Sequence, residues 1–131
     1  MFGVTILDHS DNGVLSLDLK DILLLLGSQA ESSEWEISHV EALDGVGAEE
    51  LHCLADKGAR VPGQRLIRLA SAVTQIIDGI FRGYQKGESE PWIVIQAVDS
   101  SAFDVQSDDK GVIHQIRQHF RSVVCLPIGS E

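Results

Sequence analysis

The feature that most constrains the fold is the run Trp92–Val98, which is apolar at nearly every position and rich in β-branched residues. Such a run is typical of a central strand. The sequence Asp99-Ser100-Ser101 then predicts a turn, and residues 102–106 predict a returning strand. This segment therefore indicates a hairpin within a sheet.

A second hairpin is predicted near the N-terminus, over residues 3–18. Its strands are Val4–Leu7 and Val14–Leu17. The sequence Asn12-Gly13 between them is a tight-turn signal, because both residue types tolerate a positive φ.

Two further strands are predicted. Residues 34–39 alternate between apolar and polar with period two, which is typical of a half-buried strand. Its predicted inner face carries Trp35, Ile37 and His39. Residues 123–126 predict an edge strand that ends at Pro127.

The strongest helical pattern covers residues 64–84. Apolar side chains recur there at i+3 and i+4 spacing from Leu66 to Tyr84, and Pro62 lies just before the predicted start. A glycine such as Gly79 costs a helix about 1 kcal/mol relative to alanine, so we expect it to allow the close approach of another element.

Three shorter helices are predicted. Residues 19–26 follow Asp18, a good N-cap residue, and end before Gly27. Nearly all of their side chains are apolar, so we expect this helix to be enclosed on every side. The second helix covers residues 48–57, and the third follows Asp108.

Hairpins mixed with helices favour an α+β fold rather than repeated βαβ units. The length of 131 residues suits one domain, residues 1–131. We expect an antiparallel or mixed sheet of about five strands built from two hairpins, with a long central helix and two or three shorter ones.

Charge is distributed unevenly along the chain, whose formal net charge is −10. Residues 1–60 hold 12 acidic and 3 basic residues, whereas residues 61–131 hold 8 and 7. Between Glu31 and Asp56 there are eight acidic residues and no basic residue. Such a field speeds association with a basic partner and opposes contact with a nucleic acid backbone. The alternative is an ordinary solvated surface that keeps the chain soluble.

The leading functional hypothesis is a non-enzymatic acidic interaction module, immunity-, chaperone- or adaptor-like, that binds a basic protein partner. Its carboxylates would raise the association rate and Trp35 would serve as an apolar anchor, although a strand tryptophan also suits a core. The predicted binding residues are Glu31, Glu34, Trp35, Glu36, Glu41, Glu49, Glu50 and Asp56.

Two other functions stay open. A small hydrolase-like enzyme would use Asp99, Asp104 and His114, whereas the plainer interpretation of the first two is a turn stabilised by its own side chains. A small-ligand-binding domain would use an apolar pocket between the long helix and the sheet.

The sequence favours no metal, cofactor or membrane. The five histidines form no metal-ligand pattern. The longest apolar run, Ile22–Leu26, is far shorter than the ~20 residues of a membrane span. We expect Cys53 and Cys125 to be buried thiols. Because no export signal is visible, we expect the chain to be cytoplasmic. Its oligomeric state stays open between a monomer and a homodimer.

Overall fold

Strands and helices alternate irregularly along the chain, of which the computed structural model describes residues 1–43 and 46–126. The elements are β1 (Phe2–Ile6), α1 (Leu19–Leu26), α2 (Ser28–Glu31), β2 (Glu34–Leu43), α3 (Val46–Lys57), β3 (Arg60–Pro62), α4 (Gly63–Ser71), β4 (Gln75–Tyr84), β5 (Ile93–Val98), β6 (Ala102–Ser107), α5 (Lys110–His119) and β7 (Val123–Cys125).

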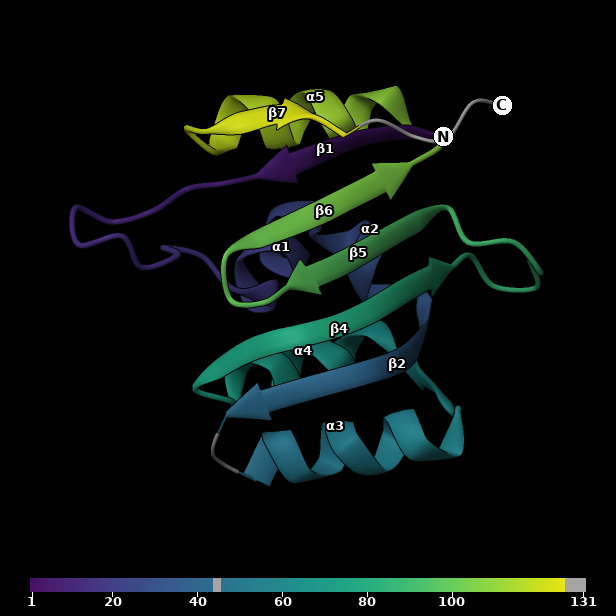
Figure 1. The fold of residues 1–131 in the computed structure, drawn as a ribbon. Coiled ribbons are helices and arrows are strands. Elements are labelled where there is room, and N and C mark those ends of the chain that lie inside the picture. Colours follow the sequence, from purple (N-terminus) through teal and green to yellow (C-terminus); the bar gives the residue numbers. More distant parts are fainter. Residues whose placement is uncertain (44–45, 127–131) are drawn as a thin grey trace.

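The strands within the described residues form one sheet in the order β3-β2-β4-β5-β6-β1-β7 (Figure 1). Every neighbouring pair is antiparallel. β5 occupies the middle of the sheet, as its apolar sequence predicts, and pairs with β6 as the predicted hairpin. The α+β class is therefore confirmed, but the sheet has seven strands rather than about five.

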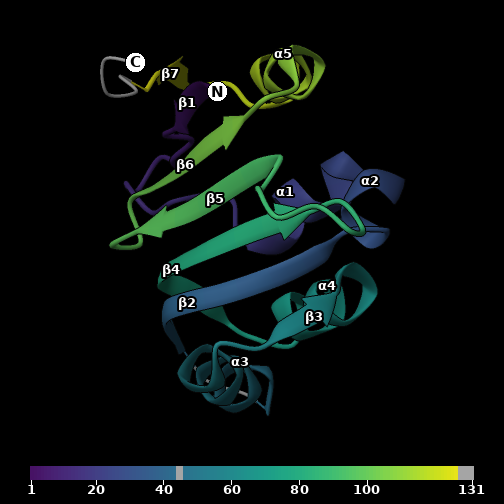
Figure 2. The same cartoon turned by 90° about the vertical axis from the view of Figure 1, so that its right-hand side faces the viewer.

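Within the described residues, helices cover only one face of this sheet. α1, α2 and α4 lie behind it in Figure 1, and Figure 2 shows them all on the same side. α3 runs beside the outer edge of β2, where the Ala42 amide donates to Nε2 of His52 at 3.4 Å. α5 lies at the opposite end of the sheet, near β1 and β7 (Figure 1). We call the helix side the covered face and the other side the open face.

The hydrophobic core fills the space between the covered face and the helices. Trp35, Phe81 and Phe103 point into it and are completely buried. Two indole hydrogen bonds fix the chain around α2: Nε1 of Trp35 donates to the Ala30 carbonyl (3.0 Å), and Nε1 of Trp92 donates to the Ser33 hydroxyl (2.9 Å). Both tryptophans are therefore structural.

The long helix predicted over residues 64–84 is wrong. α4 ends at Ser71, and residues 75–84 form the strand β4. A Cβ on Gly83 would lie 2.8 Å from Cγ2 of Ile93 and 3.0 Å from the Trp35 ring, so this position of β4 needs glycine. The apolar spacing misled because β4 carries apolar residues on both faces and has an irregular register, so its sequence shows the i+3 and i+4 spacing of a helix.

The N-terminal hairpin over residues 3–18 is also wrong. β1 pairs with β6 and β7, and residues 14–17 form no strand. An isolated bridge joins His9 to Leu15, and the amides of Ser10 and Ser16 donate to the carbonyls of Val14 and Asp8. The predicted turn is present, since Gly13 has a φ of 81° and its amide donates to the Ser10 carbonyl. Pairing with distant strands replaces the local partner because it buries Val4 and Ile6 completely.

The predicted helix over residues 19–26 is confirmed as α1. Asp18 caps it and forms a reciprocal capping box with Asp21, and Gly27 ends it with a φ of 62°. The helix is not enclosed on every side, because Leu24 is 61% exposed. α3 and α5 confirm the other two short helices, although α5 is capped by Asp109 instead of Asp108.

Four smaller expectations meet mixed results. β7 confirms the edge strand, while Pro127 lies outside the described residues. His39 is exposed rather than buried, because the backbone of β2 is irregular there and His39 has a φ of 53°.

Cys53 and Cys125 are free thiols and both are exposed, contrary to the expected burial. Among the described residues, no helix combines the length and apolarity needed to cross a bilayer.

Candidate interaction site

The open face displays every second residue of the central strands. Residues paired across strands share a face, and the buried partners identify the covered one. One row across the open face reads Arg60, Glu36, Arg82, Val94 and Gln106. The next row reads Ser38, Ile80, Gln96, Asp104, Thr5 and Val124.

Acidic residues outnumber basic ones on this face. Among the described residues of the strands it carries five carboxylates and two guanidinium groups. The carboxylates belong to Glu34, Glu36, Glu41, Asp78 and Asp104, and the guanidinium groups to Arg60 and Arg82. Glu41 and Asp78 are directly opposed in register, an arrangement that like charges make unfavourable in a lone sheet.

Both arginines are engaged in contacts within the chain. Nη1 of Arg82 lies 3.6 Å from Oε1 of Glu36 and donates to the Ser38 hydroxyl at 3.3 Å. The Arg60 guanidinium lies 3.8 Å from the centre of the Tyr84 ring, a cation–π contact that covers the tyrosine. These contacts gather the positive charge of the face at the β3–β2–β4 corner.

The other four carboxylates take part in no ion pair within the described residues. Asp104 accepts a hydrogen bond from the Thr5 hydroxyl at 2.6 Å, and Asp78 accepts one from the Asp99 amide at 2.9 Å. Glu34 and Glu41 are exposed. The carboxylates without an ion pair therefore lie on both sides of the β3–β2–β4 corner that holds the two arginines.

Apolar side chains occupy the middle of the open face. Ile80, Val94 and Val98 come from the central strands β4 and β5 and are only half-buried, because no helix covers them. Half-exposed aliphatic residues with a polar surround are the usual layout of a protein interface.

The structure distributes the predicted acidic residues over three elements. Glu34, Glu36 and Glu41 lie on β2 and reach the open face, whereas Glu31 ends α2. The remaining predicted acids lie on α3 and are exposed: Glu49, Glu50 and Asp56. Asp44, the eighth acidic residue of the segment from Glu31 to Asp56, lies outside the described residues. The excess of carboxylates is therefore a property of the open face of the sheet and not of the segment from Glu31 to Asp56.

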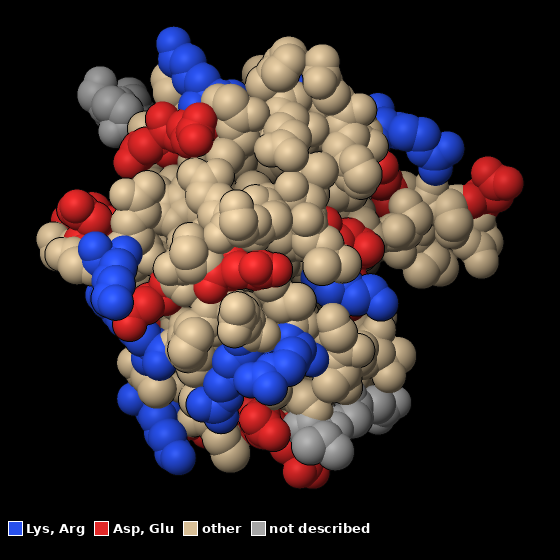
Figure 3. Space-filling view, turned by 180° about the vertical axis from the view of Figure 1, so that it is seen from behind, with Lys and Arg blue, Asp and Glu red and all other residues tan. Residues whose placement is uncertain are grey.

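Part of the predicted charge is also paired with arginines from the second half of the chain. Glu36 pairs with Arg82, and Glu50 lies 3.5 Å from Arg65 of α4. Figure 3 views the molecule from the helix side, where acidic and basic side chains are interspersed and large areas carry neither. The helix side thus lacks the excess of one sign that the open face has.

Trp35 does not serve as a surface anchor. Its side chain is completely buried, since β2 points it at the helices. Asp78, Asp104 and the apolar residues of β4 and β5 were not predicted as site residues. Only the strand register brings them beside the acids of β2, so no local sequence signal could have found them.

The residues of the hydrolase-like alternative do not converge. Asp99 lies at the tip of the β5–β6 hairpin and Asp104 on the open face. His114 is exposed on α5, a helix whose buried residues join the core on the covered side. The pocket of the ligand-binding alternative has lost its predicted wall, because the long helix does not exist.

Two hollows among the described residues lie at opposite ends of the strands, away from the middle of the open face. A cavity of about 340 Å³ is bordered by residues 14–18 together with Asp21, Thr74 and Gln75. Burial raises the pKa of the Asp18 carboxyl, and hydrogen bonds from the amides of Leu19 and Ile76 partly oppose this. These contacts make Asp18 a link between α1 and β4.

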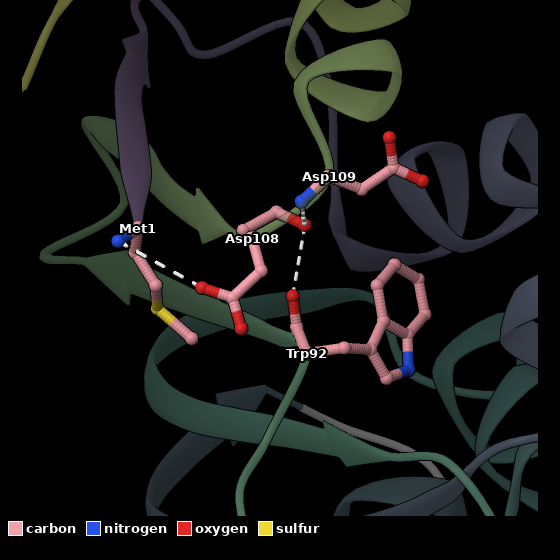
Figure 4. Close-up of polar contacts among 5 residues, drawn as sticks. Met1, Trp92, Asp108 and Asp109 are labelled. Carbon is pink, nitrogen blue, oxygen red and sulfur yellow. Dashed lines mark hydrogen bonds and ion pairs between the residues drawn. The ribbon is translucent and has the colours of Figure 1, made fainter.

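A second hollow, of about 290 Å³, lies at the other end of the sheet and includes Glu88, Glu90, Trp92 and Asp108. Figure 4 shows the Asp108 carboxylate directed at the Met1 amine, 3.7 Å away, while Asp109 points elsewhere. The Asp108 carboxylate of this hollow is therefore paired with an amine of the same chain. Among the described residues no three His, Cys, Asp or Glu side chains are arranged to hold a metal ion.

Comparisons with known proteins give no match: no family model matches the chain, and no curated protein or solved structure is significantly similar to it.

Proposed function

We propose that this chain is a non-enzymatic interaction module whose open sheet face docks on a basic surface of a partner protein. The observation that carries the proposal is the charge of a face that no helix covers: five carboxylates against two arginines that are already engaged. The proposal keeps the basic partner expected from the sequence and moves the contact surface to the sheet.

In this proposal the carboxylates and the apolar side chains of the open face contribute to binding in different ways. The carboxylates at positions such as Glu34 and Glu41 raise the rate of encounter with a basic partner. Ile80, Val94 and Val98 supply apolar area that docking removes from water. A partner with lysines or arginines opposite Glu41 and Asp78 also relieves the repulsion between those two carboxylates.

The test is site-specific photo-crosslinking in cells. Gln96, exposed in the middle of the open face, is replaced by a photoreactive phenylalanine analogue, and Gln64, exposed on α4, receives the same residue as the control. We expect a specific protein adduct from position 96 and none from position 64.

A matched pair of charge variants then tests the chemistry. Glu34→Lys with Glu41→Lys alters the open face, and Glu49→Lys with Asp56→Lys makes the same charge change on α3. We expect the first pair to abolish the adduct at position 96, the second to leave it, and high salt to weaken it. Equal loss in both pairs, or an adduct whose captured protein is acidic, contradicts the proposal.

A further inference from the structure

Within the described residues, β7 forms one outer edge of the sheet and β3 forms the other. β3 pairs with the first residues of β2, and α3 lies beside the rest of that strand. β7 pairs with β1 on one side only within the described residues, and its middle residue, Val124, is 47% exposed. An unpaired strand edge is a template for the addition of another strand.

The register shows which backbone groups of β7 are free. The Leu7 amide donates to the Ser122 carbonyl, and the Leu126 amide donates to the Gly3 carbonyl. Because antiparallel strands alternate between bonded and non-bonded pairs, residues 122, 124 and 126 face β1. The amide and carbonyl groups of Val123 and Cys125 therefore point outward, and no hydrogen bond within the described residues uses them.

The segment that forms this edge is basic, unlike the rest of the chain, and the one carboxylate that bonds to it, that of Asp8, accepts hydrogen bonds from the amides of Arg121 and Ser122. Residues 110–126 contain three basic residues and no acidic one. Lys110, His114 and Arg117 follow one another at i, i+4 and i+7 on the exposed side of α5, and Arg121 lies just beyond its end. None of these bases forms an ion pair within the described residues.

One contact joins the basic row to the strand edge. Nη2 of Arg117 lies 3.1 Å from Sγ of Cys125, so the guanidinium stands on the same side of β7 as that side chain. Val124 lies on the other side, paired with Thr5 on the open face. A strand added to β7 would therefore meet the cationic Arg117 on one side and the apolar Val124 on the other.

We propose that the β7 edge and the basic row of α5 form a second docking site, which takes an extended acidic segment of a partner protein by strand addition. Backbone hydrogen bonds to Val123 and Cys125 hold the segment, and its carboxylates meet Arg117 and its neighbours. A second copy of this chain fits less well, because a two-fold pairing of β7 brings two Arg117 side chains together.

The probe is a short fluorescein-labelled peptide of alternating glutamate and valine, whose two sides match the two sides of the edge. We expect it to raise fluorescence anisotropy at low salt, and a peptide of alternating lysine and valine to give no such rise. In amide NMR spectra, the signals of Val123 and Cys125 should shift and exchange more slowly, whereas the Val124 amide, which faces β1, keeps its exchange rate.

Cys125→Pro is the decisive variant. It removes one outward amide while the groups that face β1 remain, and Cys125→Ser is its matched control. We expect the proline to weaken binding about tenfold, the loss expected for one hydrogen bond, and the serine to have no effect. Arg117→Glu should abolish binding and Arg117→Lys retain most of it, which gives a second test that leaves the backbone unchanged.

Three results overturn the proposal. They are unchanged peptide binding by Cys125→Pro, equal binding of the lysine peptide, and a dimer of the chain that Cys125→Pro dissociates. The Glu34→Lys with Glu41→Lys variant should bind the peptide normally, so failure of this site is distinguishable from failure of the open-face proposal.

Discussion

The covered and open faces of the sheet are made by the same strands and differ in almost every physical property. Along β5, Ile93, Ile95 and Ala97 are buried against the helices, while Val94 and Gln96 between them face water. The covered face is apolar and closely packed; the open face is half-exposed and negatively charged. Stability therefore resides mainly on one side, and the other side is available for binding.

The largest expected difference concerns a matched pair of isoleucines. Ile95→Ala, on the covered face, should reduce the free energy of unfolding by about 2–5 kcal/mol, because it leaves a cavity among completely buried neighbours. Ile80→Ala, on the open face, should cost about 1 kcal/mol, since water already reaches that side chain. Urea denaturation measures both values. Equal losses would show that the open face is covered in the isolated protein.

Two adjacent residues of β4 give the next contrast. Gly83→Ala should destabilise by about 1–3 kcal/mol, because its new Cβ would overlap Ile93 and Trp35. Arg82→Gln should cost less than about 1 kcal/mol, because its partly exposed ion pair with Glu36 contributes little to stability. Thermal unfolding of the two variants measures the difference, and a larger loss for Arg82→Gln would contradict this division between the faces.

The smallest effect is a pH dependence at Asp18, beside the start of β4. Its pKa is raised in the folded state, so the folded chain holds this proton more tightly than the unfolded chain does. The contribution of Asp18 to stability is therefore full below the ordinary pKa of an aspartate carboxyl and is lost as pH rises through the higher pKa of the folded state.

Asp18→Asn, which keeps an oxygen for the Leu19 and Ile76 amides, should remove this dependence. Thermal unfolding at several pH values should show the wild type gaining stability relative to the variant as pH falls through that window. A wild type that instead loses stability relative to Asp18→Asn in the same range contradicts the assigned direction.

The sequence alone determined the local elements whose signals lie within a few residues of one another. The cap at Asp18 with Gly27 determined α1, and the run from Trp92 followed by Asp99-Ser100-Ser101 determined the central hairpin. The mixture of hairpin and helix signals likewise pointed to an α+β chain, and the composition showed its excess of acidic residues.

Only the tertiary structure decided β4, the partners of β1 and the location of the acidic surface. Residues 75–84 carry apolar spacing that fits a helix or an irregular strand, and contact with Trp35 and Ile93 selects the strand. The open face combines Glu34 and Glu41 with Asp78 and Asp104, which are far apart in sequence. Strand pairing is a long-range interaction, so which side chains share a face depends on register, and no local pattern in the chain specifies it.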